Sequence, residues 1–116
     1  MNRIEPNIQE FKSEKNLVDR MDLILYALND TVTPIPEAGT ICTFKYYAKT
    51  LNIEYDQHPL VAVSDVFPWG FRGINFHLRD YRQYTWAELG SQVYVVQQEE
   101  LDDLMSLNYK KVVLNR

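Results

Sequence analysis

The residues of this sequence best suited to chemistry are two histidines and a nearby aspartate. His58 and His77 are the only histidines, and Asp56 lies two residues before His58. Imidazole and carboxylate groups both bind zinc or iron, so these three side chains could share a metal ion. Their spacing matches no known ligand motif, however, and a structural hydrogen bond for each ring is the simpler interpretation. We therefore expect neither a metal nor a cofactor.

Nucleophilic catalysis would need a cysteine or serine beside a base. Cys42 alternates with Phe44 and Tyr46 on an apolar strand face, a pattern typical of a buried, inert thiol. Ser64 lies in an apolar run that lacks the glycines of a nucleophile elbow. The segment Gly70–Gly73 is too short for a phosphate-binding loop and has no lysine. The sequence therefore predicts a protein that is not an enzyme and takes no small-molecule substrate.

The strongest chemical signal is an aromatic and basic segment between Trp69 and Trp86, in which arginines alternate with aromatic rings. Such a surface can stack bases and neutralise phosphates, as in single-strand binding proteins. The same residue types are enriched at the energetic centres of protein interfaces. A third interpretation is purely structural, with some rings in the core and the arginines in solvent. We predict a protein interface, with nucleic-acid binding as the alternative, formed by Trp69, Phe71, Arg72, Arg79, Tyr81, Arg82, Tyr84 and Trp86.

Composition limits the class of protein. The chain has 116 residues, of which 46% are hydrophobic and 24% charged, as expected for one ordinary globular domain. Its net charge of −4 would not draw the whole molecule to nucleic acid or to acidic membranes. The longest apolar run, Leu23–Leu28, is too short to cross a bilayer, so we expect no membrane partner. A single cysteine excludes an intrachain disulfide and suits a reducing compartment.

Residues 1–30 have the apolar period of α-helices and are predicted to form a helical arm. Ile4, Ile8 and Phe11 follow one another at spacings of four and three. A second register begins at Leu17, with Asn16 suited to cap it, so a break is expected over residues 13–16. We expect the first stripe, Ile4, Ile8 and Phe11, to contact another chain, with packing on the sheet as an equally weighted alternative.

The remaining chain reads as a small sheet domain. Residues 31–38 form a connector in which Pro34 and Pro36 favour extended backbone. Residues 39–116 contain about five strand-like runs with brief turns, and residues 99–107 form a short helix with a solvated acidic start. Those acids could also pair with the basic segment across subunits. The predicted fold is α+β: a helical arm, then a small antiparallel, SH3-like, partly open β-barrel with one short helix near its C-terminus.

One polar cluster is predicted inside this domain. Asn75 and His77 lie on the same face of a strand-like run, and Asp56 precedes a strand that begins after Pro59. These side chains could form a buried polar cluster that fixes the turns of the barrel. Such a cluster needs no ligand.

Three segments in the middle of the chain form a recognisable pattern: the strand from Gly39 to Lys49, then Tyr55, Asp56, Pro59 and Leu60, then Gly73, Asn75 and His77. Together they resemble a small uncharacterised protein family of contractile-tailed bacteriophages. The chain departs from the family pattern after His77, where it reads Leu78-Arg79-Asp80-Tyr81 in place of a Tyr-Leu-Pro-Pro-like run. The resemblance implies a protein of the tail, baseplate or head–tail region, or an accessory acting on packaged DNA ends. It would be made in the host cytoplasm and assembled with other virion proteins.

Overall fold

The structure is a computed structural model, and it describes residues 2–47, 54–56, 58–90, 92–107, 109 and 111–113. Short α-helices and antiparallel β-strands make up this part of the chain, so the predicted α+β class is confirmed. The larger sheet has the strand order β1-β7-β2-β4-β5-β6, and a separate pair joins β3 to β8. The strands are β1 (Val32–Thr33), β2 (Ile41–Thr43), β3 (Glu54–Asp56), β4 (Leu60–Phe67), β5 (Gly70–Asn75), β6 (Asp80–Thr85), β7 (Val93–Val96) and β8 (Lys111–Val113).

The six-stranded sheet is open, and β1 and β6 are its edges in the described part of the chain. Its neighbouring strands pair antiparallel throughout. Gly73 permits a close backbone approach between β4 and β5, because a Cβ there would lie 2.3 Å from the carbonyl oxygen of Ala62. β2 is shorter than the predicted strand, whose last residues, 48 and 49, lie outside the described residues. The structure shows an open sheet, and the further statement that this sheet forms an SH3-like barrel remains a prediction.

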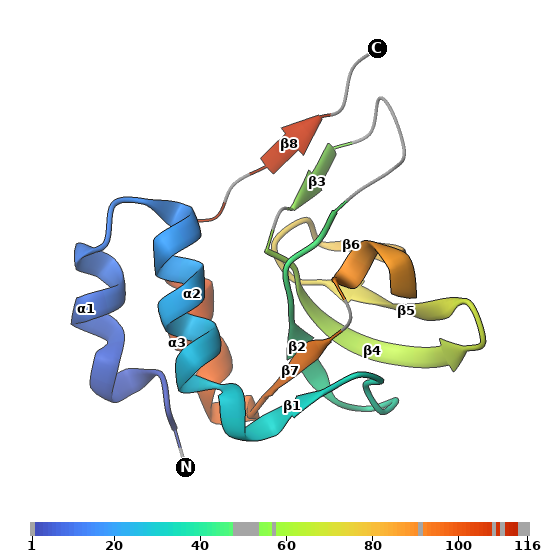
Figure 1. The fold of residues 1–116 in the computed structure, drawn as a ribbon, viewed down its shortest axis with the longest axis horizontal. Helices are drawn as coiled ribbons and strands as arrows, with labels where there is room; N and C mark the ends of the chain where they lie inside the picture. Colours follow the sequence, from blue (N-terminus) through green and yellow to red (C-terminus); the bar gives the residue numbers. More distant parts are fainter. Residues whose placement is uncertain are drawn as a thin grey trace.

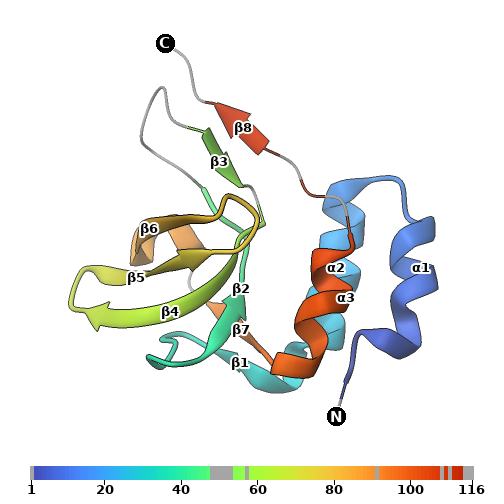
Figure 2. The ribbon, with the colours of Figure 1, turned by 180° about the vertical axis from the view of Figure 1, so that it is seen from behind.

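Three α-helices form a layer against one side of the sheet. They are α1 (Ile8–Ser13), α2 (Leu17–Ala27) and α3 (Leu101–Met105). α2 and α3 lie side by side next to the sheet, and α1 packs on the far side of α2 (Figure 1 and, from behind, Figure 2). The predicted break between the first two helices is present, and Asn16 caps α2 by accepting bonds from the N–H groups of Val18 and Asp19. No helix in this described part is long and apolar enough to cross a membrane.

The N-terminal stripe packs inside its own chain. Ile4 and Phe11 are buried in a core cluster that also contains Leu60 and Val96 of the sheet, and Ile8 packs against the same cluster. The expectation that this stripe contacts another chain is therefore wrong for Ile4 and Phe11. Burying two large apolar side chains against α2 and the sheet supplies the hydrophobic stabilisation that a partner would otherwise provide.

A second cluster fills the other side of the sheet and is rich in aromatic rings. The ring centroid of Phe44 lies 5.7 Å from that of Phe71 and 5.2 Å from that of Tyr84, in edge-to-face contacts. Phe71 and Tyr84 are therefore core residues, and the prediction that they form an interface is wrong, because strand alternation turns them inward. Cys42 is buried in this cluster as predicted, and burial raises the pKa of its thiol.

Arg3 ties the N-terminus to the start of α3 through a cluster that we call the N-terminal clasp (Arg3, Asp30, Thr31 and Glu100). The Nε and Nη2 atoms of Arg3 donate to the two carboxylate oxygens of Glu100 at 2.9 and 2.8 Å. Its Nη1 donates to Asp30 at 2.6 Å and to Thr31 at 2.8 Å. The side chain of Glu100 is fully buried, which corrects the expectation of a solvated acid at this position. Burial alone would raise the pKa of Glu100, but hydrogen bonds from Arg3 and from the Gln97 N–H lower it.

Candidate functional site

The solvent-facing side of strands β4, β5 and β6 carries a group of large side chains that we call the outer face (Phe67, Trp69, Arg72, Ile74 and Tyr81). Strand alternation produces it, because the inward positions of β5 hold Phe71, Gly73 and Asn75 and leave Arg72 and Ile74 pointing outward. Trp69, Ile74 and Tyr81 are 42%, 45% and 50% exposed. Exposed residues of this size on neighbouring strands are unusual for a surface that only meets water.

The side chains of the outer face are held in contact with one another. The rings of Phe67 and Trp69 stack with their centroids 5.0 Å apart and an angle of 6° between their planes. The guanidinium carbon of Arg72 lies 5.5 Å from the centre of the Phe67 ring and 5.6 Å from that of Tyr81. Ile74 lies directly opposite Tyr81 in the strand register. The group is thus pre-ordered and would lose little side-chain entropy on binding a partner.

Two of the three arginines in the predicted segment are paired with acids of the same chain. Arg72 Nη2 lies 2.9 Å from Asp65 Oδ2, and its hydrogen bond lowers the pKa of Asp65. Arg82 Nε donates to Asp80 at 3.0 Å. Arg79 is exposed, in a turn where its φ of 54° is unusual for a residue other than glycine. Much of the positive charge in this segment is therefore already balanced by the chain itself.

The structure brings together only part of the predicted interface. Trp69, Arg72 and Tyr81 lie on the outer face, whereas Trp86 is half-buried and its indole N–H donates to the Pro68 carbonyl at 2.8 Å. Arg79 lies in the β5–β6 turn. Arg82 lies on the side of β6 opposite to the outer face. Phe67 and Ile74 belong to the outer face but were not predicted. The period-two pattern of the two strands was the signal that could have found them.

The buried polar cluster is confirmed in its main contact. Asp56 is buried, and its Oδ2 contacts Nδ1 of His77. Its Oδ1 accepts the backbone N–H of His58 at 2.9 Å, so one carboxylate fixes both histidine-bearing segments. Asn75 makes separate bonds, donating to the Tyr84 hydroxyl at 3.1 Å and accepting from the Leu78 N–H at 3.0 Å. These bonds tie the end of β3 and the residue His58 to the turn that follows β5.

Neither metal chemistry nor a known relative assigns a role to this arrangement. Among the described residues, no three histidine, cysteine, aspartate or glutamate side chains come close enough to hold a metal ion. No family model, curated protein or solved structure matches the chain. The resemblance to a phage protein family therefore rests on the three sequence segments alone.

Proposed function

We propose that this chain is a non-enzymatic assembly protein that acts through protein–protein contacts, and that its setting is the particle of a contractile-tailed phage. The observation that supports the contact role is the outer face, where Phe67 and Tyr81 flank Arg72 and Trp69 stacks on Phe67 in an exposed, ordered group. Tryptophan, tyrosine and arginine are the residues that most often dominate interface energetics. The phage setting is supported by the sequence resemblance. In this proposal the curled sheet serves as a small SH3-like body, and a neighbouring virion subunit covers its outer face.

A protein partner fits the outer face better than nucleic acid. Backbone phosphates are bound by arginines and lysines whose charge is free to replace counterions. Here Arg72 already bonds Asp65 and Arg82 already bonds Asp80, and the chain carries a net charge of −4. A partner surface with apolar and polar groups can instead cover the rings and leave both ion pairs in place at the rim.

Particle incorporation tests the proposal. We expect the chain to be found by quantitative mass spectrometry in density-purified particles of the phage that encodes it. A Trp69→Ser, Tyr81→Ser double variant should be incorporated at least tenfold less, because each substitution removes a large contact side chain. The matched control is Tyr26→Ser, which removes the 85%-exposed tyrosine of α2, on the helical layer.

Two results would contradict this proposal. Absence of the chain from purified particles would remove the phage setting, and incorporation of the double variant at the wild-type level would remove the outer face as the contact surface. Binding of single-stranded DNA that weakens steeply with salt would favour the nucleic-acid alternative instead.

A further inference from the structure

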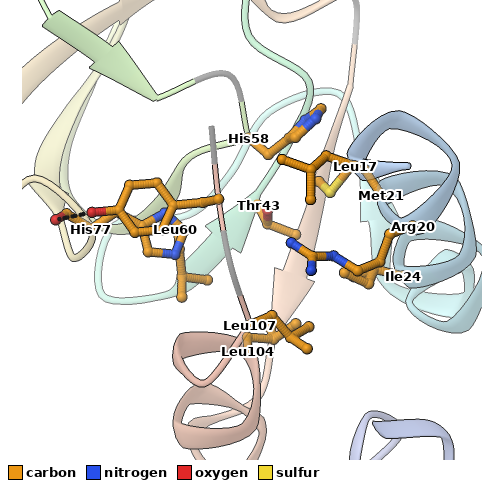
Figure 3. Close-up of a pocket in the computed structure, with 11 residues that line it drawn as sticks. Leu17, Arg20, Met21, Ile24, Thr43, His58, Leu60, His77, Leu104 and Leu107 are labelled. Carbon is orange, nitrogen blue, oxygen red and sulfur yellow. Dashed lines mark hydrogen bonds between the residues drawn. The ribbon is translucent and has the colours of Figure 1, made fainter. Parts of the chain in front are cut away.

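A pocket lies between the helical layer and the sheet, next to both histidines (Figure 3). We call it the helix–sheet pocket. Its volume is about 40 Å³, which is room for roughly three water-sized groups. No acidic residue is among the described residues that line it. Its apolar wall consists of Leu17, Met21, Ile24, Leu60, Leu104 and Leu107.

Arg20 extends from α2 into this pocket. Figure 3 shows its guanidinium reaching towards the centre of the lining residues, near Thr43. The residue is only 8% exposed, and the structure gives its side chain no hydrogen bond or ion pair with any described residue. Burial lowers the pKa of Arg20, but a guanidinium stays charged in proteins. The guanidinium nitrogens are not among the fully buried atoms that lack a partner, so they face the open part of the pocket, where an anionic ligand could pair with them.

The two histidines contribute further polar atoms without partners to the lining of the pocket. Both ring nitrogens of His58 and Nε2 of His77 are buried without a hydrogen-bond partner in the described part of the chain. Nδ1 of His77 is held by Asp56, and its ring stacks on Tyr109 with centroids 4.0 Å apart. His77 is therefore fixed in orientation, and Nε2 of an uncharged ring in this position accepts a hydrogen bond rather than donating one.

From these observations we propose that the helix–sheet pocket binds the carboxyl group of a small organic acid that has a short apolar stem. A guanidinium binds the two oxygens of a carboxylate through parallel N–H bonds, which is the geometry that Arg20 can offer. His58 also lines the pocket, and one ring N–H of a neutral imidazole can donate to the same carboxylate. This site is separate from the outer face and does not depend on the proposed assembly role.

The size and lining of the pocket define the ligand more closely. The space of about 40 Å³ takes the carboxyl group, and the wider open pocket, about 430 Å³ including solvent, leaves room for the stem against the leucine-rich wall. Each CH₂ that this wall covers should increase affinity roughly fourfold. The same chemistry occurs at the end of a short fatty acid and at the C-terminus of a peptide that ends in an apolar residue.

Matched pairs of carboxylates and amides test the site on the full chain. Hexanoate, but not hexanamide, should raise the melting temperature and shift the NMR signals of the two histidine rings. The series acetate, butyrate, hexanoate should bind with increasing affinity. N-acetyl-leucine compared with N-acetyl-leucinamide tests the peptide source, and whichever carboxylate binds more tightly identifies the closer natural ligand.

Substitutions assign the binding to Arg20. Hexanoate should bind at least tenfold more weakly to Arg20→Met, and Arg20→Lys serves as a second variant that keeps the charge but loses the fork. Lys45→Met is the control, because Lys45 pairs with Asp22 and does not line the pocket. The proposal is overturned if hexanoate and hexanamide act alike on the wild-type chain, or if Arg20→Met binds as well as wild type. A stronger response to inorganic phosphate than to any carboxylate would overturn the choice of ligand.

Discussion

The N-terminal clasp and the helix–sheet pocket each contain a buried arginine from the first twenty residues, but the two side chains have opposite surroundings. Arg3 donates to Glu100, Asp30 and Thr31, and hydrogen bonding to Glu100 raises its pKa. Arg20 has no such partner among the described residues, and burial lowers its pKa. The side chains differ little in exposure, so the difference lies in the acids that the fold places beside them.

This contrast indicates that the guanidinium of Arg3 stabilises the fold, whereas that of Arg20 is a candidate for binding a ligand. In the clasp, the Arg3–Glu100 pair completes the fold, because each group is desolvated and each finds its bonds within the chain. In the pocket, Arg20 has no partner among the described residues, and three ring nitrogens of His58 and His77 are buried without one. Buried polar groups are nearly always bonded, so these side chains are the ones that the proposed ligand would satisfy.

The largest expected effect comes from breaking the clasp. Arg3→Met leaves the fully buried Glu100 carboxylate without its main partner and should lower the free energy of unfolding by about 3–5 kcal/mol. Arg20→Met is the matched comparison and should lower it by nothing or raise it, since no bond is lost. Urea denaturation of both variants at pH 7 measures the difference. Equal losses in the two variants would remove the distinction between the clasp and the pocket.

A smaller effect is expected from the two histidines of the pocket wall. His77→Phe keeps a flat ring against Tyr109 but leaves the buried Asp56 carboxylate without its Nδ1 partner. We expect a loss of about 1–3 kcal/mol in the free energy of unfolding. His58→Phe is the control, because neither ring nitrogen of His58 has a partner in the described residues. If the control costs as much as His77→Phe, ring shape rather than the Asp56 contact stabilises this wall.

Local patterns in the sequence predicted the helices well, whereas β1 (Val32–Thr33) lies in the segment predicted as a connector. The change of apolar register over residues 13–16 marked the end of α1, and Asn16 caps α2 as its side chain suggests. The Asp56–His77 contact also followed from local cues, namely a turn-forming aspartate and a strand with polar residues at alternate positions. Two capping boxes, Thr85 with Glu88 and Gln97 with Glu100, begin short 3₁₀ turns, and their three-residue spacing is visible in the sequence.

Partnerships between distant segments could not be predicted. Arg3 and Glu100 are 97 residues apart, and nothing near either residue indicates that the other will be its partner. The N-terminal stripe was assigned to another chain for the same reason, since an amphipathic segment specifies an apolar face but not what covers it. Strand alternation places Phe71 and Tyr84 in the core and Arg72 and Tyr81 on the outer face. The sequence alone shows only a continuous run of aromatic and basic residues, which hides this division.

The smallest expected effect is the pH dependence contributed by His58, which distinguishes an empty pocket from an occupied one. Burial lowers the pKa of His58 below its usual value near 6.5, and the positive charges of Lys45 and Arg20 lower it further. The negative charges of Asp56 and Asp22 act in the opposite direction. The unfolded chain then binds more protons than the folded chain below about pH 6.5, so stability falls as the pH decreases through the folded pKa. Relative to His58→Phe, the wild type should therefore lose free energy of unfolding between pH 7.5 and 5.5 in chloride buffer.

Saturating hexanoate should reduce this loss, because a bound carboxylate favours the charged imidazole. An identical pH profile for the two chains would mean that His58 is not desolvated in the folded protein.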